Sequence, residues 1–200
     1  DVAAAVHHHG AAAYGMNAVA AGPGWAALGA LSLTLGVHAL DPDLPEEQRR
    51  KEMLAFGLAR NIEKMKADLA RYRIRYDRWF HESELHASGY VEETVRLLTD
   101  RGHTYEKDGA LWLKTSAFGC DKDDVLMRGN GVYTYFAADI AYHRDKLSRR
   151  GFDRALNVWG ADHHGHVKRV QAALDALGLD GTNRLEIVLM QLVRLTRDGE

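Results

Sequence analysis

The chain has little cysteine and little net charge, and both shortages exclude classes of protein. Cys120 is the only cysteine among 200 residues, so neither an internal disulfide framework nor a cysteine-based zinc site can form. A lone thiol fits a reducing compartment, so we expect a cytoplasmic protein. The formal charge of −2 gives no overall basic field, and contact with nucleic acid would therefore require a local basic patch.

Charge is also missing locally, because residues 2 to 40 contain no Asp, Glu, Lys or Arg. Without a basic stretch at the start, a secretory signal is not supported. The uncharged length would permit a membrane span, but Gly-Pro-Gly at residues 22–24 interrupts it and the remainder is short for a bilayer. We expect residues 1–40 to be a buried or poorly specified segment. We assign no function to its histidines, His7 to His9, which can bind metal adventitiously or derive from a tag.

From Asp41 onward, hydrophobic periodicity predicts regular structure. The stretch "EEQRRKEMLAFGLARNIEKMKADLARY", which follows Pro45, has helical spacing of its apolar residues and an acidic first turn, so it predicts a long amphipathic helix. The alternation in "IRYDRWF" predicts a short strand. "SGYVEETVRLLTDRG" predicts a helix that ends at Gly102.

Two candidate hairpins follow in the sequence. In "TYEKDGALWLK" the pair Asp108-Gly109 suits the positive backbone torsions of a two-residue turn, and Asn130-Gly131 does so in "VLMRGNGVYTYF". We expect both hairpins to be structural. Residues 73–134 are predicted to form a small subdomain inserted beside the main sheet.

The stretch "TYFAADIAYHRDKLSRRGF" predicts a helix capped by Thr134 and stopped by Gly151. Tyr135 and Asp139 lie four positions apart, so their side chains project from one face. A phenol beside a carboxylate suits a cation, above all a guanidinium, whose donors match a carboxylate two at a time. The alternative is a solvated Asp139 near a helix end, and Asp145, further along the same helix, is expected to be solvated.

Polar residues gather in "RALNVWGADHHGHVKRVQAAL", between a predicted buried strand and a helix that ends at Gly178. Strand, glycine turn and helix form the unit of a parallel nucleotide-binding sheet, in which ligands lie beyond the carboxyl ends of the strands. The turn, Gly160 to Gly165, would place His163, His164 and His166 at that edge. A metal site and a plain polar helix start remain alternatives.

Four motifs occur in a recognisable order: "TYEKDGALW", "TYFAADIAYH", "NVWGADHHGH" and "LMQLVRLTRDGE". Through them the chain from about Asp41 to Glu200 resembles the catalytic domain of arginyl-tRNA synthetases. The resemblance implies an α/β fold, a Rossmann-like parallel sheet with flanking helices and an inserted α+β hairpin subdomain. Residues 41–200 would be part of a class I synthetase catalytic domain.

The same resemblance implies an enzyme with arginine, ATP and tRNA(Arg) as partners and no membrane. Arginine would attack the α-phosphate of ATP to give arginyl-adenylate, and the arginyl group would then pass to the terminal ribose of the tRNA. Mg²⁺ would accompany ATP, without a bound structural metal. No residue is assigned a catalytic role. The residues implied to bind arginine are Tyr135, Asp139 and His163. Those implied to border ATP and the adenylate are Gly160, Asp162, His163 and His166.

Two signatures of the class do not occur in the sequence. No HIGH-type motif lies in the first 40 residues, and a KMSKS-like loop would be expected after "RDGE". We therefore expect a fragment that activates arginine poorly by itself.

Two other functions stay open. One is a metal-dependent phosphoesterase of the DHH type, since Asp162-His163-His164 spells that motif. That type needs further aspartates at strand ends, and the only close cluster of them, Asp121, Asp123 and Asp124, lies in an expected loop. The other is a non-catalytic binding module derived from a synthetase.

Overall fold

The fold was analysed in a computed structural model that describes residues 43–191 and residue 196. The described residues divide between two units, with the boundary between Trp79 and Phe80. The expectations for residues 1–40 lie outside the described residues. Within the described part of the chain, no helix is long and apolar enough to cross a membrane.

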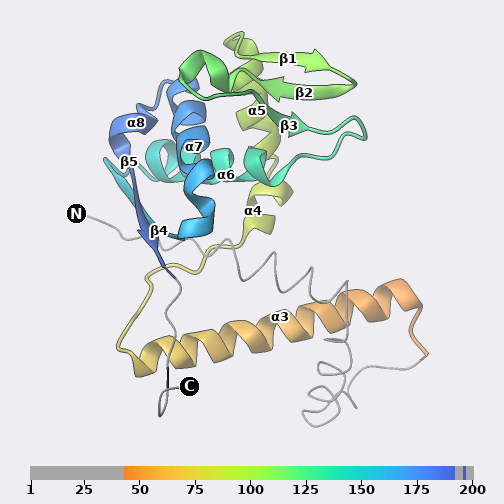
Figure 1. Ribbon diagram of the computed structural model, residues 1–200. Helices are drawn as coiled ribbons and strands as arrows, with labels where there is room; N and C mark the ends of the chain where they lie inside the picture. The colour runs from red at the N-terminus through yellow and green to blue at the C-terminus, as the bar shows by residue number, and fades with distance from the viewer. Residues whose placement is uncertain (1–42, 192–195, 197–200) are drawn as a thin grey trace. The chain divides into compact units, whose positions relative to one another are not determined.

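The unit before Phe80 is dominated by one helix, α3 (Glu46–Arg71), which begins directly after Pro45 as predicted (Figure 1). None of its side chains is buried. The chain that follows makes a local aromatic contact, with Lys66 5.4 Å above the ring of Trp79. The predicted strand over "IRYDRWF" is wrong, because this segment pairs with no strand among the residues described.

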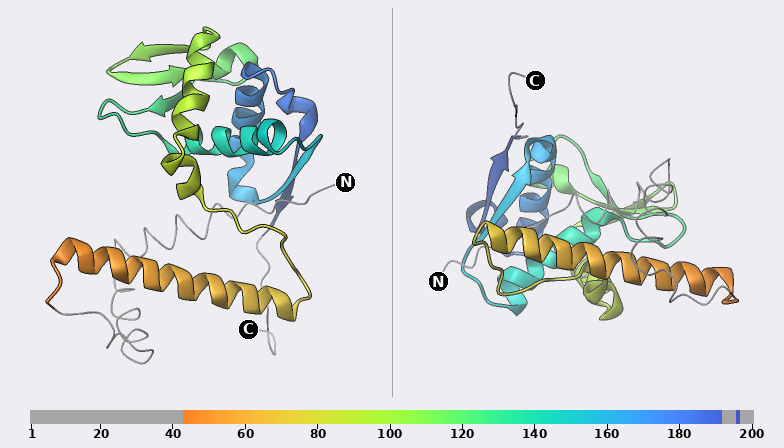
Figure 2. Two further views of the ribbon diagram at one scale, coloured as in Figure 1. Left: turned by 180° about the vertical axis from the view of Figure 1, so that it is seen from behind. Right: turned by 90° about the horizontal axis from the view of Figure 1, so that it is seen from below.

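The unit from Phe80 onward contains two separate sheets with helices between them (Figures 1 and 2). Strands β1, β2 and β3 form an antiparallel sheet, while β4 and β5 pair in parallel. The elements, in chain order, are α4 (Glu82–Ala87), α5 (Tyr90–Asp100), β1 (Thr104–Lys107), β2 (Ala110–Leu113), η2 (Thr115–Phe118), β3 (Asp124–Met127), α6 (Tyr135–Arg144), η3 (Asp145–Arg149), β4 (Ala155–Gly160), η4 (Ala161–His163), α7 (His164–Ala176), α8 (Gly181–Arg184) and β5 (Leu185–Met190).

The first predicted hairpin is confirmed and the second is only partly formed. Asp108 and Gly109 have φ angles of 52° and 73°, as a two-residue turn between antiparallel strands requires. After β3, the turn at Asn130 leads back to a single bridge between Met127 and Tyr133 instead of a full strand. Helix α6 begins at Tyr135, only two positions after Tyr133, so no room is left for a longer return strand.

The predicted helix boundaries are largely confirmed. Gly102, Gly151 and Gly178 follow α5, η3 and α7 with φ angles of 76°, 70° and 68°, values that glycine adopts without steric cost. Thr134 caps α6 by accepting a hydrogen bond from the Ala137 amide at 3.4 Å. Beyond Arg144 the helix widens into the π-helical turn η3.

The strand, turn and helix unit is confirmed, because β4, η4 and α7 follow one another and β5 returns parallel to β4. Helices α6 and α7 pack against each other between the two sheets (Figure 2). They bury the centre of the core, whose largest fully buried apolar side chains include Phe136, Leu85, Leu98, Leu113, Leu126, Ile140, Leu174 and Leu185. A helix packed on both sides must bury polar residues too, and this is where the candidate site lies.

Candidate functional site

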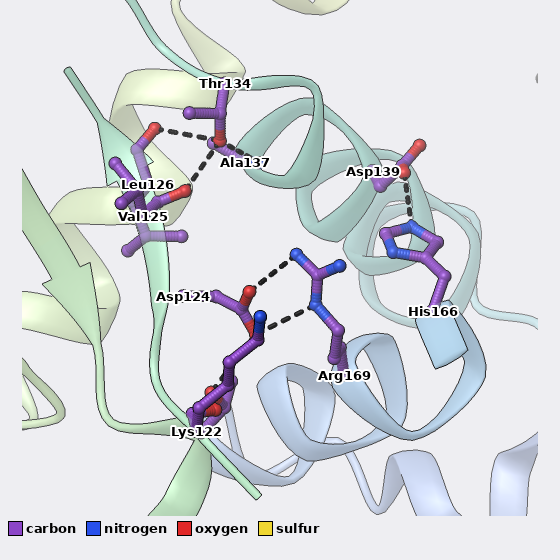
Figure 3. Close-up of polar contacts among 10 residues, drawn as sticks. Lys122, Asp124, Val125, Leu126, Thr134, Ala137, Asp139, His166 and Arg169 are labelled. Atoms are coloured by element: carbon purple, nitrogen blue, oxygen red, sulfur yellow. Dashed lines mark hydrogen bonds and ion pairs between the residues drawn. The ribbon is translucent and has the colours of Figure 1, made fainter. Parts of the chain in front are cut away.

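Asp139 lies in the middle of α6 and is buried, with only 1% of its surface exposed. Its carboxylate Oδ2 accepts a hydrogen bond from Nε2 of His166, near the start of α7, at 2.7 Å (Figure 3). The alternative of a solvated Asp139 is therefore wrong. The reason is tertiary: α6 is enclosed by α5, α7 and β3, so its polar positions face other elements instead of water.

Aromatic rings surround the imidazole of His166. Ring centroids lie 5.6 Å away at Tyr135, 5.8 Å at Phe136 and 5.4 Å at Trp159. In such apolar surroundings the interaction between His166 and Asp139 is stronger than it would be in water. Tyr135 itself is 61% exposed, so this arrangement runs from a solvent-exposed phenol down to a buried carboxylate.

The glycine turn after β4 lies at the carboxyl edge of the parallel pair, as the sequence predicts, because Gly160 pairs with Met190 at the last register position. A Cβ atom added to Gly160 would lie 2.5 Å from Oδ1 of Asp162, so the turn is tight. His163 Nε2 lies 3.8 Å from Oδ2 of Asp162, and both side chains are at least partly exposed. Only His166 of this set turns into the core.

The DHH-type alternative is not supported by the carboxylates it needs. Among residues 43–191, no group of three His, Cys, Asp or Glu side chains could hold a metal ion. Asp123 accepts hydrogen bonds from the Ser116 hydroxyl at 2.6 Å and from the Tyr105 hydroxyl at 2.9 Å. Asp124 is engaged by Arg169. The side chains of Asp123 and Asp124 therefore link the antiparallel sheet to the elements packed against it.

The ion pair between Asp124 of β3 and Arg169 of α7 was not predicted. It has two contacts, Nε to Oδ2 at 2.8 Å and Nη2 to Oδ1 at 2.6 Å, and the guanidinium also lies 4.8 Å from the ring centre of Phe136 (Figure 3). Burial lowers the pKa of Arg169, but Asp124 and Tyr135 outweigh it, so this pKa is raised. The only signal in the sequence is the spacing of three between His166 and Arg169, which places them on one helix face.

A second buried polar group, which includes His143 of α6, also escaped sequence reasoning. Lys146 Nζ donates to Oδ1 of Asn157 at 2.9 Å, and the Asn157 amide meets Nε2 of His143. His143 Nδ1 in turn meets the backbone carbonyl of Asp139 at 2.7 Å. Burial, followed by the charge of Arg150, lowers the pKa of Lys146 to about 7.

The expectation that Asp145 is solvated is wrong. Its side chain is fully buried, and Oδ1 lies 2.6 Å from Nη2 of Arg149, while Nη1 of Arg150 lies 4.0 Å from Oδ2. Two guanidiniums at ion-pair distance compensate the buried charge. Arg149 lies four positions after Asp145 within η3, so the two side chains are neighbours along the helix.

The motifs and the fold agree with known proteins. Residues 49–195 match the family described as tRNA synthetases class I (R), catalytic domain. An arginine–tRNA ligase of Caldanaerobacter subterraneus subsp. tengcongensis is 58% identical over 158 residues, which are 79% of this chain and 28% of that protein. That of Ruminiclostridium cellulolyticum is 57% identical over 154 residues, 77% of this chain and 27% of that protein.

Solved structures give the same result. A Campylobacter jejuni protein provisionally assigned as an arginyl-tRNA synthetase superposes with a TM-score of 0.76 at 35% identity, covering 85% of this chain and 37% of that one. The Thermus thermophilus arginyl-tRNA synthetase, at 20% identity, has a TM-score of 0.59 over 73% of this chain and 32% of its own, and shows the fold alone.

The described unit from Phe80 onward, with its parallel strand pair and flanking helices, shares its fold with a solved class I synthetase structure. The chain belongs to the family of class I tRNA synthetases (R), catalytic domain. The predicted family and α/β fold class are thereby confirmed. The chain spans 28% of the length of the first of these curated relatives. The extent of the inserted subdomain, residues 73–134, stays a prediction.

Proposed function

We propose that this chain forms the arginine-binding and adenylate-binding part of an arginine–tRNA ligase. In the proposed reaction the arginine carboxylate attacks the α-phosphate of ATP and pyrophosphate leaves. A hydroxyl of the terminal ribose of tRNA(Arg) then attacks the carbonyl carbon of the adenylate, which forms the ester and releases AMP. The observation that carries the proposal is the buried carboxylate of Asp139 beneath the exposed phenol of Tyr135, within the matched family region.

For arginine, we assign Asp139 as the partner of the guanidinium. A guanidinium offers planar, paired donors that a carboxylate matches better than any other side chain does, and burial strengthens the pair. His166 already contacts Asp139, so the guanidinium would either share this carboxylate with the imidazole or replace it. Tyr135 would cover the substrate from the solvent side, and His163 would border its α-carbon end.

For ATP and the adenylate, we assign the turn that follows β4. Gly160 brings backbone close to the ligand, while Asp162, His163 and His166 offer hydrogen-bonding groups for ribose and base. Mg²⁺ would be held largely by phosphate oxygens and water, as is usual for this ion. The residues of the turn would thus act by positioning and by charge stabilisation.

The proposal is tested by amino-acid-dependent exchange of pyrophosphate into ATP, in the full-length ligase that carries these residues and with tRNA(Arg) present. Arginine should support exchange, whereas lysine, which lacks the planar fork of donors, should not. Equal exchange with both amino acids, or none with arginine, would refute the proposed function. The protein is expected to work in the cytoplasm, in keeping with its single thiol.

A further inference from the structure

A continuous chain of hydrogen bonds runs through the core from η3 to the backbone of Asp139. It passes from Lys146 to Asn157 in β4, then to His143 in α6, and ends on the carbonyl oxygen of Asp139. None of these four residues exposes more than 1% of its surface. The chain therefore lies wholly inside the protein and reaches Asp139 at its backbone carbonyl, whereas His166 contacts its side chain.

The direction of each bond in this chain is fixed by chemistry. Lys146 can only donate, so Oδ1 of Asn157 accepts and its amide group donates to Nε2 of His143. His143 must then carry its proton on Nδ1, because the carbonyl of Asp139 can only accept. The network suits only a neutral His143 of this tautomer, and every bond depends on the one before it.

Joining a helix to a strand through a buried polar network carries a desolvation cost. An apolar side chain at the position of Asn157 would pack against α6 without any desolvation cost, whereas polar groups in the core require complete partners. The network does something that apolar packing cannot: it fixes the rotation and height of one turn of α6 relative to β4 by directional bonds. That turn carries Asp139.

Electrostatics link the two ends of the network as well. Burial and Arg150 lower the pKa of Lys146 to about 7, and the carboxylates of Asp139 and Asp145 oppose that shift. The charge of Asp139 therefore acts on the amine, whose hydrogen bond goes to Asn157 and which lies over the ring of Tyr142.

We propose that the Lys146–Asn157–His143 network is a positioning device for arginine recognition, with Asn157 as its central positioning residue. The inference rests on the proposed function, because it takes Asp139 to be the guanidinium partner. None of the three side chains would contact the substrate. They would act by holding the Asp139 carboxylate at the place where a rigid, planar guanidinium can meet it with two hydrogen bonds.

The test is steady-state ATP–pyrophosphate exchange in the full-length ligase with tRNA(Arg), comparing Asn157→Leu with wild type. We expect the KM for arginine to rise at least about tenfold while the KM for ATP stays within about twofold. Leu98→Ala serves as the control, since Leu98 is fully buried in α5 and its truncation loosens the core away from this network. Parallel rises in both KM values, as in a loosened core, would overturn the proposal.

A second variant, Asn157→Asp, carries the test if Asn157→Leu does not fold. Its carboxylate still accepts from Lys146 but cannot donate to a neutral His143, so the network can close only when His143 is protonated and donates from Nε2. His143 faces the carbonyl of Asp139, the rings of Tyr142 and Trp159, and Asn157. Relative to wild type, the arginine KM of Asn157→Asp should recover as the pH is lowered, because a proton on Nε2 of His143 restores the missing donor.

The two proposals fail in different ways. If Asp139→Asn weakens arginine binding but neither Asn157 variant does, the positioning network is refuted and the proposed function stands. A relative arginine KM of Asn157→Asp that does not change with pH also counts against the network. If wild type shows no arginine-dependent exchange, the proposed function is refuted, and the positioning network falls with it.

Discussion

The carboxylate of Asp139 and the imidazole of His166 meet at 2.7 Å across 27 positions of sequence, and both side chains are buried. The contact joins α6 to α7 at the carboxyl edge of the parallel sheet. A buried carboxylate is costly to desolvate, so Asp139 is a strong candidate for a cationic partner.

Replacing that carboxylate tests the assignment directly. Asp139→Asn keeps the side-chain volume and removes the charge, so it should cost about 2 to 5 kcal/mol of arginine binding, against under about 1 kcal/mol for a surface ion pair. The KM for arginine in pyrophosphate exchange should rise by at least an order of magnitude, with little change for ATP. Asp100→Asn, on an exposed position of α5, is the control. Equal losses for both substrates would remove Asp139 from the arginine site.

The glycine turn allows a complementary test on the ATP side. In Gly160→Ala the new methyl group would meet Oδ1 of Asp162 at 2.5 Å and displace that carboxylate. We expect the KM for ATP to rise several-fold while the KM for arginine changes less. Gly57→Ala, a helical position in α3 with nothing within 4 Å of the added atom, should leave both values near wild type. An unchanged ATP KM in Gly160→Ala would place the nucleotide elsewhere.

The Asp124–Arg169 pair should matter for stability. Because the pair is mostly buried and makes two contacts, Arg169→Met should lower the free energy of unfolding by about 2 to 3 kcal/mol. A double-mutant cycle with Asp124→Asn in urea denaturation should give a coupling of at least about 1 kcal/mol. The exposed pair between Arg154 and Glu186 is the comparison and should couple by less than about 1 kcal/mol. Equal coupling in the two cycles would contradict a structural role for Arg169.

The lowered pKa of Lys146 predicts that the free energy of unfolding depends on pH. Its folded-state pKa of about 7 lies below the ordinary value of 10.5, so the unfolded chain binds more protons between these values and stability rises with pH there. The unfolding free energy of wild type relative to Lys146→Met should therefore increase by about 1.4 kcal/mol per pH unit from about pH 7.5 to about pH 9.5. Lys168→Met, exposed on α7, should run parallel to wild type in urea denaturation. Parallel curves for Lys146→Met as well would show that its amine is not titrating in this range.

The sequence predicts the fold well where local signals and tertiary packing agree. The Asp108-Gly109 turn, the Thr134 cap and the strand, turn and helix unit around Gly160 all follow from the chemistry of a few neighbouring residues. The strand expected before Phe80 fails because alternation cannot supply a pairing partner. The second predicted hairpin is only partly formed, because the chain after its turn makes a single bridge instead of a full return strand.

The interior of the site is harder to predict. Helical spacing places Tyr135 and Asp139 on one face, but it cannot say that α6 is enclosed on several sides. For that reason Asp145 reads as a surface residue, although it is buried against Arg149. The network through Asn157 gives no local signal at all, because it joins residues from three elements whose proximity only the folded chain creates.

One turn of α7 carries both His166 and Arg169, and each reaches a different aspartate, Asp139 in α6 and Asp124 in β3 (Figure 3). A small rotation of α7 would move both contacts together. Under the proposed function, recognition of arginine and attachment of the antiparallel sheet therefore depend on the placement of the same helix. A substitution in α7 that shifts Arg169 would then disturb the Asp139 contact as well, although the two aspartates lie in different elements.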